Sequence, residues 1–180
     1  MSEAKPPIKI SELFQVGIVV HDLEKSMKDY ETLLGINSWK VLEVNDDSLK
    51  FTYHGKPVKH SFRAAMTMLG SFMVELLQPV EGESVYRDFL NEHGEGLHHL
   101  GHVRVDDLDE AVQALEKAGF PCIETGGDTL GFHSWAYVDT TSLLGYVLEL
   151  STGFDPRDMF KGHLSKNEIG NVKDNQSPKT

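Results

Sequence analysis

The sequence has little cysteine, no long apolar run and a shortage of basic residues, and each of these excludes a class of protein. Cys122 is the only cysteine, which rules out an internal disulfide framework and suits a small core residue in a reducing cytoplasm. No apolar run approaches the roughly 20 residues that span a bilayer, and residues 1–10 contain no apolar signal-peptide core. We therefore expect a cytoplasmic protein with no membrane partner.

The charge balance is strongly acidic, with 17 Lys and Arg against 28 Asp and Glu and a formal net charge of −11. Binding to a phosphate backbone needs clustered basic side chains, so we expect no nucleic-acid partner. An anionic substrate is still compatible with this charge, because a bound cation can invert the local field. With 39% hydrophobic and 25% charged residues, the 180-residue chain is typical of a globular protein.

A repeat organises the chain. Residues 14–35 and 98–119 each contain a β-branched strand, an Asp-Leu helix start, an amphipathic helix of about twelve residues and a closing glycine. The aspartates suit N-caps and the glycines suit the left-handed position after a helix. These four residues are Asp22, Gly35, Asp107 and Gly119. The copies lie half a domain apart, so the pattern indicates two copies of one module rather than a solenoid.

Strand-like runs follow each predicted helix. They are Trp39–Val44, Phe62–Leu69 and Phe72–Leu77 in the first half, and Cys122–Glu124, His133–Val138 and Tyr146–Leu150 in the second. Each half is therefore predicted to be a βαβββ module, and residues 84–92 to be a short connecting helix. The predicted fold class is α+β, with the two modules forming paired curved mixed sheets around a common cleft.

We predict one domain over residues 12–152, with module 1 at about 12–80 and module 2 at about 96–152. Residues 153–180 are polar without clear periodicity and are predicted to be a loosely attached tail. The alternative is a tail that packs in order against a partner subunit. We expect the protein to be a homodimer.

Four polar residues interrupt otherwise apolar strands at matching places in the two modules, the first and last strand of each. They are Gln15, Glu75, His99 and Glu149. Each alone is ordinary, because a buried Glu is usually salt-bridged and a buried His usually hydrogen-bonded. Two carboxylates in apolar strands are costly unless paired or bound to a cation, and one imidazole, two carboxylates and one amide suit a divalent ion. Together the four residues predict a metal-binding cleft.

The sequence resembles the vicinal oxygen chelate superfamily over roughly residues 12–152. This superfamily includes glyoxalase I, methylmalonyl-CoA epimerase, extradiol dioxygenases and bleomycin-resistance proteins. The segments that carry the resemblance are Gln15 to Gly35, Val74 to Pro79, Gly94 to His99 and Gly145 to Leu150. Within this superfamily the sequence most resembles the epimerase-like branch. The segments that carry this resemblance are Glu95 to His99 and the connector Ser84 to Glu92 before it.

The resemblance implies metal ligation by Gln15, Glu75, His99 and Glu149. This Gln, Glu, His, Glu shell is the one seen in the glyoxalase I branch. The stretch from His99 to Asp107 is one residue longer than the family pattern, so either a β-bulge absorbs the extra residue or His98 or His102 is the ligand instead. The acid that epimerases carry on the third strand has no counterpart in Phe62 to Met66.

The resemblance implies chemistry on a carbonyl polarised by Zn, Ni, Co or Mn. We expect an isomerase or epimerase, or a glyoxalase-type lyase. In it Glu149 removes the α-proton, and Glu75 acts on the opposite face of the same substrate carbon. If Glu149 is not the base, the next candidates are His98, His102 and His133. The expected substrate is a small carbonyl compound, an acyl-CoA or a thiol adduct. The alternatives are a non-catalytic binding or resistance protein and an Fe(II) ring-cleaving dioxygenase, which Gln15 disfavours because that chemistry uses two histidines.

Overall fold

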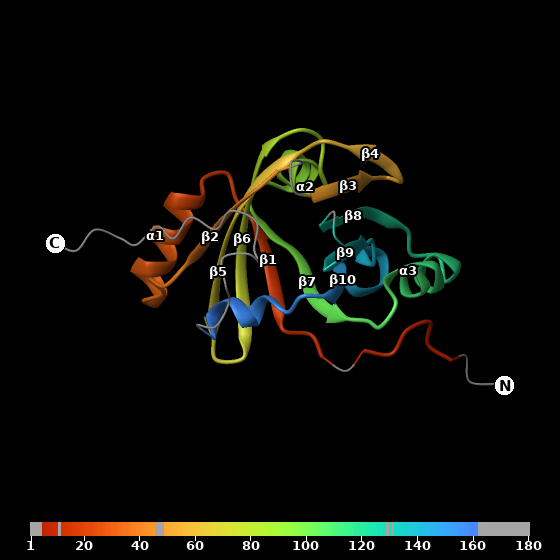
Figure 1. Cartoon of the computed structure of the whole chain (residues 1–180). Helices are drawn as coiled ribbons and strands as arrows, with labels where there is room; N and C mark the ends of the chain where they lie inside the picture. The colour runs from red at the N-terminus through yellow and green to blue at the C-terminus, as the bar shows by residue number, and fades with distance from the viewer. Residues whose placement is uncertain (1–4, 11, 46–48, 129, 131, 162–180) are drawn as a thin grey trace.

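The structure is a computed structural model that describes residues 5–10, 12–45, 49–128, 130 and 132–161 (Figure 1). The helices are α1 (Leu23–Leu34), α2 (Val85–His93), α3 (Leu108–Lys117), α4 (Thr141–Leu144) and the 3₁₀ helix η1 (Pro156–Phe160). The strands are β1 (Gln15–Val19), β2 (Lys40–Val44), β3 (Leu49–Tyr53), β4 (Lys56–Val58), β5 (Ser61–Leu69), β6 (Phe72–Glu81), β7 (Gly96–Arg104), β8 (Cys122–Asp128), β9 (His133–Val138) and β10 (Val147–Gly153). No helix in these ranges is long and apolar enough to cross a membrane.

All ten strands form one mixed sheet in the order β2-β5-β6-β1-β7-β10-β9-β8-β3-β4. Each module contains a parallel pair, β1 with β6 and β7 with β10, and the modules meet where β1 runs antiparallel to β7. The sheet curls as it passes from one module to the other (Figure 1). The predicted α+β class with two related modules is confirmed, and the two expected sheets are joined into one across the β1–β7 seam.

The two repeat helices begin and end as the sequence predicts. The Asp22 and Asp107 carboxylates each accept a hydrogen bond of 2.9 Å from the backbone N–H three residues on. Gly35 and Gly119 have φ of 70° and 95°, in the region that side chains disfavour. These caps satisfy backbone groups that a helix end leaves open.

Helices α1 and α3 cover one face of the sheet, and the opposite face, called the inner face below, carries the candidate site. Leu23 of α1 packs on Ala65 and Leu76, and α3 packs in a second cluster built on β7, β9 and β10. Helix α2 lies on the inner face instead, where Tyr86 is buried with Leu77 and Tyr137. The connecting helix therefore closes part of the inner face.

The sequence did not predict the β3–β4 hairpin, the short helix α4 or the 3₁₀ helix η1. The β3–β4 hairpin lies within module 1 in sequence, but β3 pairs with β8 of module 2. The prediction of a loose tail from residue 153 is wrong as far as Phe160, because η1 buries Met159 in a cluster with Phe14, Met66 and Met73. Its apolar side chains pack against residues of module 1, and this burial orders the segment despite its polar composition. Residues 162–180 lie outside the described residues.

The seam depends on close contacts at two glycines. A Cβ on Gly17 would lie 1.9 Å from the His99 ring, and one on Gly101 would lie 2.1 Å from Glu149 Oε2. Each glycine thus makes room for a side chain of module 2 on the inner face.

We predict that Gly17→Ala destabilises the protein by about 1–3 kcal/mol, because the added methyl group forces the buried His99 ring out of place. Urea denaturation measures this effect. Gly96→Ala on β7 is the matched control, since its Cβ would meet only Phe89 at 3.9 Å. Equal stability of the two variants would contradict the close contact.

Candidate functional site

The structure brings the four residues singled out in the strands together around one atom, His99 Nε2. Glu75 Oε2 lies 3.7 Å and Glu149 Oε2 lies 3.6 Å from this nitrogen. Gln15 Nε2 lies 3.5 Å from it and donates a 2.6 Å hydrogen bond to Glu75 Oε2. Two carboxylates, one from each module, therefore flank a single imidazole.

Strand register explains this convergence. Gly17 on β1 is paired with Glu75 on β6 on one side and with His99 on β7 on the other. Gln15 lies two residues before Gly17 and so points to the same face, because side chains alternate along a strand. Gln15 is itself paired with Gly101, so that each proposed ligand of a first strand faces a glycine of the other module.

A β-bulge absorbs the extra residue between His99 and Asp107, as one of the two sequence interpretations requires. Leu148 pairs with Leu100 and Leu150 with Val103, so β7 has one residue more than β10 in this interval. His102 within the bulge has a left-handed φ of 57°. Its backbone N–H donates to Glu149 Oε2 at 3.1 Å, and its ring stacks on His133 at 5.8 Å rather than joining the His99 cluster.

His98 lies behind His99 rather than in its place. The two Nδ1 atoms are 3.0 Å apart, a hydrogen bond whose direction depends on the tautomers. Tyr86, Phe89 and Tyr137 surround the His98 ring at 5.3 to 5.6 Å between centroids. Burial lowers the pKa of His98 to about 3 and lowers the pKa of His99 well below its usual value, so both rings are neutral. In the tautomer in which His99 Nδ1 donates to His98, the Nε2 lone pair of His99 is free to bind a cation.

Both carboxyl groups are held in surroundings that disfavour their charge. The side chains of Glu75 and Glu149 are only 13% and 7% exposed. Burial raises the pKa of both, and for Glu75 the nearby charge of Glu149 raises it further. The hydrogen bonds from Gln15 and from the His102 backbone act in the opposite direction. Two buried carboxylates with elevated pKa values are an arrangement typical of proton transfer or cation binding.

The donor set fits a divalent cation, with small movements. Among the described residues, no three His, Cys, Asp or Glu side chains are already arranged to hold a metal ion. Two ligand atoms bonded to one ion at about 2.0–2.2 Å lie roughly 3–3.5 Å apart, slightly closer than the 3.6–3.7 Å from His99 to the two carboxylates. Rotation of the Gln15 amide would turn its oxygen toward the same point. These four side chains therefore suit the divalent cation that the sequence predicts.

The third strand of module 1 supplies no acid. Its inner residue Met66 pairs with Glu75, and Arg63 points away to form a bidentate ion pair with Glu24 of α1. Tyr86 is a further residue beside the site, and its hydroxyl lies 2.7 Å from that of Tyr137. No sequence signal placed Tyr86 there, because its position depends on how α2 docks on the inner face.

Comparisons with known proteins agree with this geometry. A family model described as the glyoxalase/bleomycin resistance protein/dioxygenase superfamily matches residues 14–138. Mouse mitochondrial methylmalonyl-CoA epimerase is 28% identical over 116 residues, covering 64% of this chain and 57% of that protein. The uncharacterized protein YqjC of Bacillus subtilis is 27% identical over 106 residues, covering 59% and 66%. The chain thus matches less than two thirds of the length of these curated relatives.

Solved structures share the fold. Methylmalonyl-CoA epimerase from Mycobacterium tuberculosis matches with a TM-score of 0.54 and 23% identity, covering 83% of this chain and 93% of that one. A Streptomyces coelicolor methylmalonyl-CoA epimerase variant in complex with 2-nitronate-propionyl-CoA matches with a TM-score of 0.53 and 20% identity, covering 81% and 96%. With a family model matching well over half of its length, the chain belongs to the glyoxalase/bleomycin resistance protein/dioxygenase superfamily, the vicinal oxygen chelate group that its sequence resembles.

Proposed function

We propose that the protein is a metal-dependent isomerase or lyase that moves a proton on the carbon next to a carbonyl group. The observation that carries this proposal is the pair of buried carboxylates, Glu75 and Glu149, on either side of His99 Nε2. Proton removal needs an acceptor beside a group that stabilises negative charge on the substrate oxygen. The carboxylates supply the acceptor, and a divalent cation held by them and by His99 would supply the stabilisation.

Gln15, Glu75, His99 and Glu149 would hold the metal ion, one pair from each module. A divalent ion in this shell supplies Lewis-acid polarisation of the substrate carbonyl. His98 fixes the orientation of the His99 ring through the 3.0 Å contact between their Nδ1 atoms. Such outer partners of a ligating histidine hold its tautomer and direction.

Glu149 is the proposed base. Burial raises its pKa, which gives it more basicity than an exposed carboxylate, and the N–H of His102 holds one of its oxygens in place. Tyr137 on β9 is the cross-strand neighbour of Glu149 on β10 and is almost fully buried. Its side chain would therefore shield this side of the site from water. When it is not bound to the cation, Glu149 can therefore take up a proton near neutral pH and return it.

Glu75 is placed to serve the opposite face of the same carbon. It comes from module 1, and Gln15 steadies it through a 2.6 Å hydrogen bond. Transfer by one carboxyl group and return by the other inverts a centre, which is epimerisation. Return to the neighbouring carbon instead is a 1,2-shift of the glyoxalase kind.

The two substrate classes rest on different observations. The similarity to methylmalonyl-CoA epimerases, some solved in complex with 2-nitronate-propionyl-CoA, supports an acyl-CoA thioester. The Gln, Glu, His, Glu donor set and the lack of an acid on β5 support a thiol adduct of an aldehyde, handled by a lactoylglutathione lyase-like reaction. We place the acyl-CoA first, because the similarity to epimerases extends over most of the fold.

The first prediction concerns metal content. We expect about one Zn, Ni, Co or Mn ion per chain, and we expect Glu75→Ala and Glu149→Ala each to weaken binding at least about tenfold, since each removes a charged ligand. Elemental analysis and calorimetric titration measure this. Glu24→Ala, on the exposed surface of α1, is the control. Purified protein that takes up no divalent ion would refute the proposed site.

The second prediction concerns His98. His98→Phe should keep the packing against Tyr86 and Phe89 but remove the hydrogen bond to His99, and so weaken Co(II) affinity about 10- to 100-fold. The absorption spectrum of the Co(II)-loaded protein should also change as the imidazole reorients. His93→Phe, at the exposed end of α2, should change neither. An unaltered spectrum and affinity in His98→Phe would mean that His99 needs no such support.

The third prediction concerns proton transfer. Metal-loaded protein in D₂O should exchange the α-proton of methylmalonyl-CoA or of a hemithioacetal, as followed by NMR. Glu149→Gln should lower the exchange rate by about 10²- to 10⁴-fold with substrate binding largely intact, because the amide can ligate but cannot accept the proton. Glu124→Gln, a buried carboxyl group on β8, is the matched control. Exchange at the wild-type rate in Glu149→Gln would place the base elsewhere, with His98, His102 and His133 as the next candidates.

A further inference from the structure

Two separate elements cover the inner face on either side of the candidate site. Along β6 the residues that point to this face are Met73, Glu75 and Leu77, because side chains alternate along a strand. Leu77 packs in one cluster with Tyr86 of α2. Met73 packs in another cluster with Met159 of η1, which crosses β5 and β6 in blue in Figure 1. Glu75 therefore lies between a patch covered by α2 and a patch covered by η1.

The candidate ligands are almost closed off from solvent between these two covers. His99 is 0% exposed and Gln15 is 3% exposed. The side chains of Glu75 and Glu149 are nearly as buried. A substrate cannot pass side chains that are packed this closely, so one of the two covers has to move before a ligand reaches the site.

Helix α2 is the more firmly held of the two covers. It buries three residues, which are Val85, Tyr86 and Leu90. The Val85 N–H also donates a 3.0 Å hydrogen bond to the buried Glu124 of β8. The shorter η1 buries only Pro156 and Met159. The free energy of local opening rises with the apolar surface that becomes exposed, so η1 is the cover that opens at lower cost.

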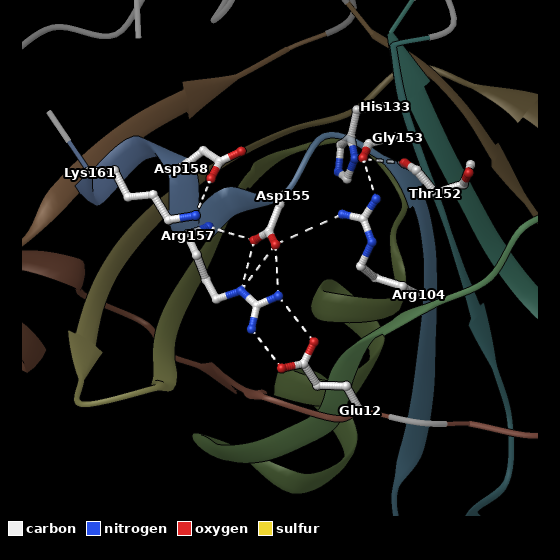
Figure 2. Close-up of polar contacts among 9 residues, drawn as sticks. All are labelled: Glu12, Arg104, His133, Thr152, Gly153, Asp155, Arg157, Asp158 and Lys161. Carbon is white, nitrogen blue, oxygen red and sulfur yellow. Dashed lines mark hydrogen bonds and ion pairs between the residues drawn. The ribbon is translucent and has the colours of Figure 1, made fainter. Parts of the chain in front are cut away.

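Ion pairs at the start of η1 connect it to both modules (Figure 2). The Arg157 guanidinium donates to both carboxylate oxygens of Glu12, at 2.7 and 3.0 Å, in the segment before β1. It also donates to Asp155 at 2.7 Å. On the other module, Arg104 of β7 donates to the Gly153 carbonyl at 2.9 Å. Arg157 and Glu12 are partly exposed, and water and salt weaken such pairs, which suits a contact that forms and breaks.

We propose that residues 154–161 form a gate over the candidate site and that the ion pair between Arg157 and Glu12 is its latch. The gate turns about Gly153 at the end of β10, whose φ of 82° is in the region that glycine adopts most easily. Opening lifts Met159 from Met66 and Met73 and exposes the inner face beside the site. The gate controls access for any ligand, so its test does not depend on the proposed reaction.

A thiol placed under the gate reports its opening. Met66 is 4% exposed, is paired with Glu75 on β6 and packs in the same cluster as Met159. The thiol introduced by Met66→Cys should react with N-ethylmaleimide only when the gate is open, and mass spectrometry of peptides follows the reaction. Met73→Cys provides a second reporter in the same cluster. The natural Cys122 on β8 is the internal reference in either protein, because it lies outside the covered cluster.

Variants of the gate should change the reaction of the reporter alone. Arg157→Gln, which removes the latch, should raise its labelling rate about three- to fivefold. Met159→Ala, which removes the buried anchor, should raise it at least about tenfold. Arg63→Gln breaks a matched bidentate pair with Glu24 on the covered face of α1 and should change nothing at the reporter. Unchanged labelling in both gate variants, or an equal rise at Cys122, would overturn the gate.

Metal exchange gives a second measurement. Arg157→Gln should speed both uptake of Co(II) and its release to a chelator at least about threefold, with Kd within about twofold of the wild-type value, because the gate supplies no ligand. A change in Kd without a change in either rate would contradict the gate. If the protein takes up no Co(II), the proposed function fails, and thiol labelling still decides whether the gate exists.

Discussion

Two carboxylates buried around one neutral imidazole are the constraint on which the rest of this structure depends. Glu75 and Glu149 lie within 3.7 Å of His99 Nε2 in surroundings that raise the pKa of both groups. An apolar protein interior does not tolerate such a pair unless protons, hydrogen bonds or a cation compensate for the charge. The small residues at the seam, the bulge in β7 and the docking of α2 all serve to hold these three side chains close to one another.

The organisation into two modules could be predicted from the sequence repeat, because the residues that define the repeat act locally. An aspartate that caps a helix and a glycine that ends it act within one turn, so Asp22, Gly35 and Asp107 could be read from the sequence. The β3–β4 hairpin could not be assigned, since β3 joins the sheet only by pairing with β8, more than 70 residues along the chain. The ordered segment at Met159 could not be predicted for the same reason, because it packs against Phe14, Met66 and Met73, which lie more than 80 residues earlier in the chain.

The candidate site could be predicted from the sequence wherever side chains alternate regularly along a strand. A polar residue in an apolar strand identifies the face it occupies, and this principle brought Gln15, Glu75, His99 and Glu149 into one set. Alternation fails at a bulge, so the sequence left His98, His99 and His102 as alternative ligands. Register resolved their places, with His99 facing the carboxylates, His98 behind it and His102 turned toward His133.

The central claim is that one divalent cation joins the two modules through these four side chains. Crystals of the protein grown with cobalt, measured above and below the cobalt absorption edge, test it most directly. We expect a single strong anomalous peak per chain within about 2.0–2.3 Å of Gln15 Oε1, His99 Nε2 and the carboxylates of Glu75 and Glu149. A cobalt peak elsewhere on the chain, or no peak while the four side chains keep their hydrogen bonds, would contradict it.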